Sequence, residues 1–247
     1  SVKKRTVEWV MLLLLLTGVY FLSREAARVT MVETGKPRVV VIDAGHGGED
    51  PGKVGVNQAL EKDINLAIAR LVEEKLRDEN VTVVMTREAD QQLGQADGGS
   101  QKAADMRERC RIINESGAAC AVSIHQNSYT EPFASGAQVF YYETSAEAQS
   151  FAAIMQRKLA EALDQDNHRE CKGNTTYYVL KKTSIPIIIV ECGFLSNPGE
   201  ADLLLTSDYQ ERVAQADWSS DVCSSDLTAI KCKEYGFKGC TTLVNCL

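Results

Sequence analysis

The stretch Arg38-Val-Val-Val-Ile-Asp-Ala-Gly-His-Gly-Gly48 decides the fold of this chain. Its first half is a β-branched run, which is typical of a buried strand, and its second half is a glycine-rich turn that ends the strand. A helical pattern follows over residues 61–79, where Ile64, Ile68, Val72 and Leu76 recur every four residues. A strand, a turn and an amphipathic helix in this order predict the first unit of an α/β domain.

The rest of the body repeats this alternation. We predict further helices at 101–115, 146–163 and around 209–216, and further strands at 81–85, 119–124, 138–142, 177–180 and 186–190. Strands that alternate with helices favour a parallel sheet. We therefore predict one α/β domain over residues 37–216, with a twisted, mainly parallel central sheet that is flanked by helices on both faces.

The amino-terminal end differs from this body in composition. Lys3-Lys4-Arg5 precedes an uncharged run from Trp9 to Leu22, which contains five consecutive leucines. Cations before an apolar run of this length are typical of a secretory signal, and the run is short for a membrane span. We interpret residues 1–36 as a signal peptide or an N-terminal membrane anchor plus linker. Either interpretation places the body outside the cytoplasm.

The carboxy-terminal end changes composition again. Residues 217–227 read like the in-frame translation of a sequencing-adaptor primer, so we interpret residues 217–247 as a non-native tail. The alternative is a cysteine-rich metal or disulfide module, since four of the eight cysteines lie here: Cys223, Cys232, Cys240 and Cys246. That alternative fits zinc templates badly because the tail contains no C-x-x-C pair.

The overall charge and composition exclude several classes of function. The chain has 27 Lys and Arg against 34 Asp and Glu, a formal net charge of −7. Binding of nucleic acid through its phosphates needs a basic surface, so we expect no nucleic-acid partner. Hydrophobic residues make up 44% and charged residues 25% of the chain. These proportions are typical of a globular protein and exclude a disordered or polytopic membrane chain.

Polar side chains follow several of the predicted strands. His46 follows the first strand, His125 the third and Glu191 the last. Because ligands bind beyond the carboxyl ends of parallel strands, we expect these side chains in one crevice. Two imidazoles and a carboxylate predict a divalent metal, since catalytic zinc takes such ligands and keeps one position open. Glu61, which opens the helix after the glycine turn, is the best third ligand beside the histidines. Glu191 is then the base that accepts a proton from water.

Each of these residues also has a purely structural interpretation. His46 fits a glycine turn, Glu61 complements a helix dipole, and Glu191 pairs with an arginine in the core. A nucleotide site is a further alternative, because Gly45-x-Gly47 follows a strand. The third glycine of the dinucleotide fingerprint is missing, however, and Asp50 occupies its place.

Six motifs occur in order along the body and carry a family resemblance. They are Val40–Gly48, Glu61 with Asn65-Leu66, Thr86-Arg87, Arg109 with Asn114, Ser123–Asn127 and Glu191–Asn197. Together they resemble the zinc-dependent N-acetylmuramoyl-L-alanine amidases of bacterial cell walls, over about residues 38–216. The resemblance implies one zinc ion held by His46, Glu61 and His125, with Glu191 as the catalytic glutamate. We also expect Arg87 and Asn127 to contact the substrate.

The implied reaction is hydrolysis of the amide bond between the lactyl group of N-acetylmuramic acid and L-alanine in peptidoglycan. The single-domain layout with an apolar amino-terminal segment is most similar to the germination-specific spore cortex amidases. This similarity implies a role in cortex maturation, through muramic-δ-lactam formation, or in germination. The alternatives are a vegetative amidase of cell separation or wall turnover, and a metal-free peptidoglycan-binding module that is not an enzyme.

The resemblance also carries expectations about partners and location. Peptidoglycan is the implied substrate, and an activating lipoprotein is an implied partner. We expect an extracytoplasmic protein, secreted or membrane-anchored, in the forespore or spore envelope. Membrane contact is expected only through the amino-terminal segment.

Overall fold

The structure is a computed structural model that describes residues 11, 17–18, 39–79 and 81–217. The chain separates into two compact units, Ser1–Arg38 and Val39–Leu247. In the first unit the described residues are helical. The remainder of the predicted signal or anchor, and the predicted tail beyond residue 217, lie outside the described residues. Among the helices that the structure describes, none combines the length and apolarity that a membrane crossing requires.

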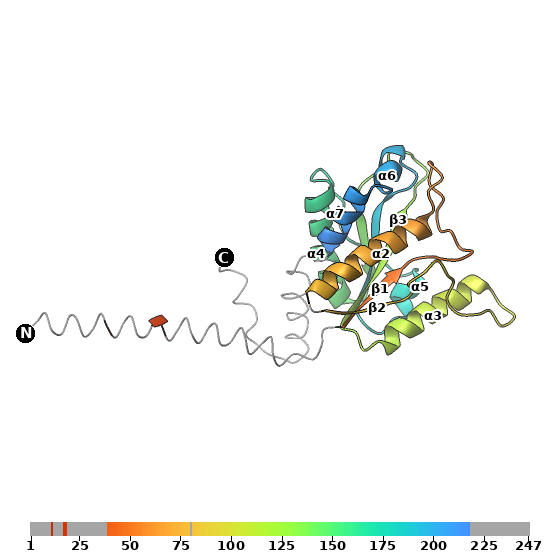
Figure 1. Ribbon diagram of the computed structural model, residues 1–247, viewed down its shortest axis with the longest axis horizontal. Coiled ribbons are helices and arrows are strands. Elements are labelled where there is room, and N and C mark those ends of the chain that lie inside the picture. The colour runs from red at the N-terminus through yellow and green to blue at the C-terminus, as the bar shows by residue number, and fades with distance from the viewer. Residues whose placement is uncertain (1–10, 12–16, 19–38, 80, 218–247) are drawn as a thin grey trace, which may run out of the picture. The chain divides into compact units, whose positions relative to one another are not determined.

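A six-stranded sheet forms the centre of the second unit, in the spatial order β2-β1-β3-β6-β4-β5 (Figure 1). The strands β2, β1, β3 and β6 run parallel to one another, whereas β4 lies antiparallel to β6 and β5 pairs parallel with β4. The prediction of a mainly parallel sheet is confirmed. The bounds are β1 Val39–Ala44, β2 Thr82–Met85, β3 Cys120–Asn127, β4 Gln138–Tyr142, β5 Lys172–Asn174 and β6 Ile187–Phe194.

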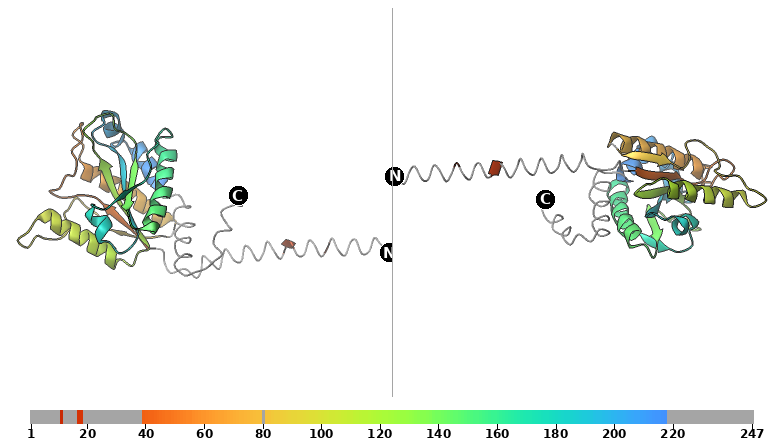
Figure 2. Two further views of the ribbon diagram at one scale, coloured as in Figure 1. Left: turned by 180° about the vertical axis from the view of Figure 1, so that it is seen from behind. Right: turned by 90° about the horizontal axis from the view of Figure 1, so that it is seen from below.

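Helices cover both faces of this sheet (Figure 2). One face packs against α2, α4 and α7, and the other packs against α3 and α5. The predicted layering is therefore confirmed. The bounds are α2 Glu61–Asp78, α3 Gln101–Glu115, α4 Ala146–Leu163, α5 Tyr178–Lys182, α6 Pro198–Leu203 and α7 Ser207–Asp217.

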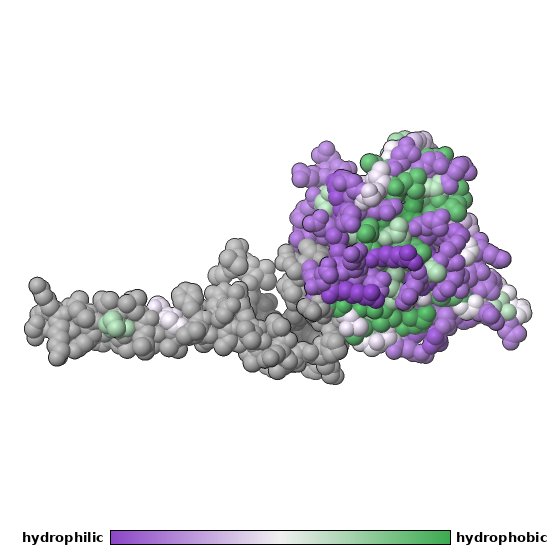
Figure 3. All heavy atoms as spheres, viewed as in Figure 1, coloured by the Kyte–Doolittle hydropathy of each residue, from purple (hydrophilic) through white to green (hydrophobic). Residues whose placement is uncertain are grey.

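The helix α2 illustrates why this sequence forms these layers. Its buried stripe contains Ile64, Ile68 and Val72, which lie one helical turn apart and pack on the sheet. Its outer side carries exposed charged residues, among them Arg70 and Glu74. The surface of this layer in Figure 3 is accordingly largely hydrophilic.

Two predicted details were wrong, and two elements were missed. Residues 177–180, predicted as a strand, lie at the start of α5, because the Asn174 side chain accepts hydrogen bonds from the backbone of Thr176 and Tyr177 and turns the chain. The strands β3 and β6 extend to Asn127 and Phe194, beyond their predicted ends. The missed elements are β5 and α6. For α6 the sequence did contain a signal, an Asn cap followed by Pro198.

A buried ion pair joins three elements of the sheet and its helical layer. The carboxylate of Asp43, in β1, accepts hydrogen bonds from Arg109 of α3 at 2.6 Å, from Ser123 of β3 at 2.6 Å and from Thr86 at 2.7 Å. Burial by itself would raise the pKa of Asp43. The charge of Arg109 and the hydrogen bonds from Ser123 and Thr86 outweigh it and lower the pKa from 3.8 to about 2.

Replacing Asp43 by asparagine is expected to lower the free energy of unfolding at pH 7 by about 3 kcal/mol, because the buried Arg109 keeps only one of its two carboxylate partners, Asp105. A lowered pKa stabilises the fold above the unfolded-state pKa of 3.8, and this contribution disappears as the pH falls towards 2. The difference between the wild type and Asp43→Asn should therefore narrow between pH 4 and pH 2 in denaturant titrations. The exposed Asp97→Asn is the control, and a difference that stays constant with pH contradicts the assignment.

Candidate active site

Two buried arginines hold the loop that carries His46. Arg87 donates to the carbonyls of Ala44 and Gly45 at 2.8 and 3.0 Å. Arg109 donates to the carbonyls of Ala44 and His46 at 2.7 and 2.6 Å. His46 itself has a φ of 61°, which is uncommon for a residue other than glycine. The charged donors from two separate segments of the chain therefore stabilise a backbone conformation that residues other than glycine rarely adopt.

Arg87 was predicted to contact the substrate, and the structure places its side chain elsewhere. Its remaining hydrogen bonds reach the carbonyls of Lys62 and Ala89, and only 1% of the residue is exposed. Arg87 is also absent from the lining of the cavity described below. Substrate binding by Arg87 stays a prediction that this arrangement does not support.

Side-chain alternation along the strands places two predicted residues on one face of the sheet. In β3, Ala121 packs on the face that α3 and α5 cover, so His125 projects to the same side. In β6, Ile187 and Ile189 lie on that face, and Glu191 follows them at the same spacing. His125 and Glu191 are register partners inside the sheet, not residues that come after their strands as predicted.

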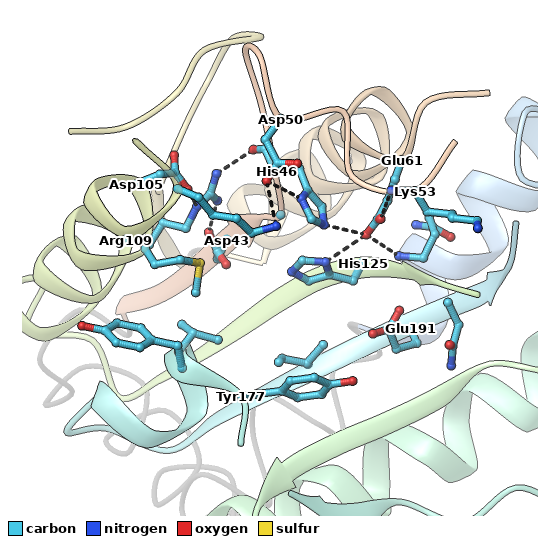
Figure 4. A pocket seen from close by; sticks show the side chains of 18 of the residues that line it. Asp43, His46, Asp50, Lys53, Glu61, Asp105, Arg109, His125, Tyr177 and Glu191 are labelled. Atoms are coloured by element: carbon cyan, nitrogen blue, oxygen red, sulfur yellow. Dashed lines mark hydrogen bonds and ion pairs between the residues drawn. The ribbon is translucent and has the colours of Figure 1, made fainter. Parts of the chain in front are cut away.

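The predicted ligands His46, Glu61 and His125 come together at this edge of the sheet (Figure 4). The Oε1 atom of Glu61 lies 3.2 Å from Nε2 of His46 and 2.9 Å from Nδ1 of His125. One donor atom from each residue lies within 4.8 Å of the others. Two imidazoles and one carboxylate at this spacing can hold a divalent metal ion.

The Glu61 carboxylate is held from several sides. Its Oε2 accepts a hydrogen bond from the backbone N–H of Lys53 at 2.7 Å, and Oε1 accepts one from the backbone of Gln126 at 3.1 Å. Burial opposes the ionisation of Glu61, but the hydrogen bonds and charges of the two histidines outweigh it and hold its pKa far below the usual value. The carboxylate is therefore ionised and oriented for a cation.

The second ring nitrogen of His46 also has a partner. Its Nδ1 lies 3.0 Å from Oδ2 of Asp50, and Lys102 lies 3.5 Å from the same oxygen. Although burial works against protonation, Glu61 and Asp50 together raise the pKa of His46. A carboxylate behind a ligating histidine fixes the orientation of the ring. In the sequence Asp50 was interpreted only as the residue in place of a fingerprint glycine, and its spacing from His46, in a turn with a φ of 61°, gave no signal for this contact.

Glu191 lies beside the three ligands and differs from them in its environment. The residue is 9% exposed, and its Oε2 is buried without a hydrogen-bond partner in the described part of the chain. Burial raises the pKa of Glu191 from 4.5 to about 7, against a smaller lowering influence of His125. A carboxyl group with a free oxygen and a pKa near neutrality is suited to accept and return a proton.

These residues line a cavity of about 480 Å³. Asn127, predicted to contact the substrate, is among its lining residues and is half-buried, so that prediction stays open. The opposite wall comes from α3 and α5, and none of its residues belongs to the six motifs. The wall residues are Lys102, Met106, Tyr177, Tyr178 and Val179.

Gly45 lies so close to His125 that a side chain at this position would displace the ring. A Cβ atom there would come within 2.3 to 2.7 Å of three ring atoms of His125. Gly45→Ala is therefore expected to weaken binding of a divalent metal by about tenfold or more while the fold is retained. Isothermal titration with the metal measures this. Gly99→Ala, where a Cβ meets no atom within 4 Å, is the control, and equal affinities of the two variants would contradict the geometry.

The chain is similar to known proteins in both sequence and fold. The family model described as N-acetylmuramoyl-L-alanine amidase matches residues 40–220. The germination-specific N-acetylmuramoyl-L-alanine amidase of Bacillus subtilis is 38% identical over 182 residues, which cover 72% of this chain and 76% of that protein. The amidase AmiA of Escherichia coli is 28% identical over 227 residues, covering 74% and 75% of the two chains.

A solved structure agrees with these matches. The CwlD amidase from Clostridioides difficile, in complex with the GerS lipoprotein, is 33% identical and superimposes with a TM-score of 0.73. The similarity covers 78% of this chain and 99% of that one. Motifs, architecture and relatives agree, and the chain belongs to the N-acetylmuramoyl-L-alanine amidase family.

Proposed function

We propose that this chain hydrolyses the lactyl–L-alanine amide of peptidoglycan, with a zinc ion held by His46, Glu61 and His125 and with Glu191 as the catalytic base. The observation that carries the proposal is the convergence of three donor atoms within 4.8 Å, next to a buried carboxyl oxygen that has no partner. A metal-free binding module would not need three converging metal-ligand atoms. It would also not keep a buried oxygen without a partner, because such an oxygen costs stability.

The donor set favours zinc among the divalent cations. Catalytic zinc sites use histidine and carboxylate ligands, whereas magnesium and calcium prefer oxygen ligands alone. When bound, zinc polarises the scissile carbonyl and makes a coordinated water acidic enough to react near neutral pH. The Asp50 carboxylate keeps His46 oriented for this ion.

Glu191 provides the proton transfers that amide hydrolysis needs. Its carboxylate removes a proton from the attacking water, and the resulting carboxylic acid returns that proton to the departing nitrogen of L-alanine. A pKa raised by burial to about 7 suits both steps, because neither protonation state is strongly disfavoured. The products are the lactyl carboxylate and a free stem peptide that begins with L-alanine.

The biological setting that we propose is the spore cortex. The support is the similarity to the germination-specific amidase of Bacillus subtilis and to CwlD of Clostridioides difficile. The solved complex of CwlD with the GerS lipoprotein supports a lipoprotein partner for this chain as well. Peptidoglycan lies outside the cytoplasmic membrane, so we place the catalytic unit there, delivered by the segment 1–36 as a signal or an anchor.

The base assignment predicts that Glu191→Gln abolishes cleavage while zinc stays bound. Loss of a general base is expected to lower kcat by about 1,000-fold, since the glutamine cannot accept a proton. Peptidoglycan is incubated with each protein, and mass spectrometry measures free peptides that begin with L-alanine. Bound zinc is measured on the same samples by atomic absorption.

The controls separate this assignment from the reaction itself. The exposed Glu170→Gln should behave as wild type, and a chelator should abolish activity until zinc is restored. Full activity of Glu191→Gln would show that another group is the base. New reducing sugar ends in place of free peptides would show a glycosidase.

The spore role predicts complementation. Bacillus subtilis that lacks its germination-specific amidase is supplied with this chain, and the muropeptides of its spores are analysed. Muramic-δ-lactam should reappear with the wild-type chain and stay absent with Glu191→Gln. Cleavage of peptidoglycan in vitro without any restored lactam, even with the lipoprotein partner co-expressed, would favour the vegetative role.

A further inference from the structure

The cavity wall opposite the candidate ligands contains a tyrosine in a fixed position. Tyr177 directly precedes α5, and its backbone N–H donates to the Asn174 side chain at 2.8 Å. Its ring packs edge-on against Phe140 of β4, with the ring centroids 5.5 Å apart and the planes at 76°. The Asn174 turn positions the backbone of Tyr177, and the contact with Phe140 supports one face of its ring environment.

The hydroxyl of Tyr177 is directed into the cavity, towards the side where Glu191 lies (Figure 4). Tyr177 is 37% exposed, and within the described ranges its hydroxyl has no hydrogen-bond partner. The hydroxyl is thus a donor that no neighbouring group uses. The ligands and Glu191 lie across the cavity from it, so a bound amide would lie between the two sides.

The charges around Tyr177 keep this donor protonated. Burial and the negative charges of Glu191 and Glu61 all raise the pKa of Tyr177 above its usual value of 10. The phenol therefore carries its proton throughout the pH range in which Glu191 works. The neighbouring carboxylates accept hydrogen bonds and donate none when they are ionised. The hydroxyl of Tyr177 therefore adds a hydrogen-bond donor that these groups lack.

We propose that Tyr177 is a catalytic residue whose hydroxyl donates a hydrogen bond to the oxygen of the scissile amide. This inference rests on the proposed function, because it requires an amide between Tyr177 and Glu191. Hydrolysis turns the carbonyl oxygen into an oxyanion in the transition state, and a fixed donor stabilises that charge more than the neutral carbonyl. The hydroxyl keeps its proton throughout, so the proton balance of the reaction stays with Glu191 and water.

A tyrosine in such a wall can also serve as a flat surface for a sugar or peptide. The two roles differ in which atoms of Tyr177 matter. A packing surface needs the ring and not the hydroxyl, whereas an oxyanion donor needs the hydroxyl. The variant Tyr177→Phe keeps the ring and its contact with Phe140, and it removes one oxygen atom.

The test compares Tyr177→Phe with Tyr129→Phe in the full chain. Tyr129 is 59% exposed and does not line the cavity, which makes it a control for the loss of a tyrosine hydroxyl. Peptidoglycan fragments of defined length are the substrate, and kcat, KM, bound zinc and the melting temperature are measured for each protein. We expect Tyr177→Phe to lower kcat by about 100-fold with little change in KM, and Tyr129→Phe to match the wild type.

A second measurement uses a muramoyl peptide in which a phosphinate replaces the scissile amide. The Tyr177→Phe variant should bind this tetrahedral, charged mimic at least about tenfold more weakly than the wild type, with unchanged zinc content. A kcat within about threefold of the wild type, or a loss of activity that follows a loss of zinc, would overturn the role of Tyr177. An inactive wild type that holds zinc would instead refute the proposed function, which keeps the two failures distinguishable.

Discussion

The guanidinium of Arg109 connects the folded core to the candidate metal site. On one side it pairs with Asp43 and Asp105 at 2.6 Å each, and on the other it donates to the carbonyl of His46. Burying this cation is costly unless every charge is matched and hydrogen-bonded, and here the matching groups come from β1 and α3. The position of His46 therefore depends on the same ionic contacts that stabilise the sheet. Loss of Arg109 would change fold and site together.

That His46, Glu61 and His125 would lie together was predictable, because strand ends obey a general geometric rule. Parallel strands end at one edge, so His46 and His125 had to meet there, and Glu61 followed from its place at the first turn of α2. Arg87 shows the limit of this rule. A strand end specifies where a residue lies, but the direction of a long side chain depends on which carbonyls it finds.

The cavity wall was harder to predict, for a different physical reason. The run 177–180 has the aromatic and aliphatic composition of a strand, and the turn that the Asn174 side chain holds before it leads the chain into a helical turn instead. A side chain that accepts backbone hydrogen bonds outweighs weak intrinsic preferences over so short a segment. Asp50 was missed because its role depends on the unusual backbone of His46, with a φ of 61°, and no spacing rule describes that conformation.

The candidate metal ligands and the opposite wall of the cavity come from separate parts of the chain. The candidate ligands and the candidate base lie on strands β3 and β6, on the loop after β1 and at the start of α2, whereas the wall belongs to α3 and α5. A substitution at the exposed wall position Tyr178 leaves the hydrogen bonds of the candidate ligands untouched. The shape of the cavity could therefore be retuned at such a position without rebuilding the scaffold.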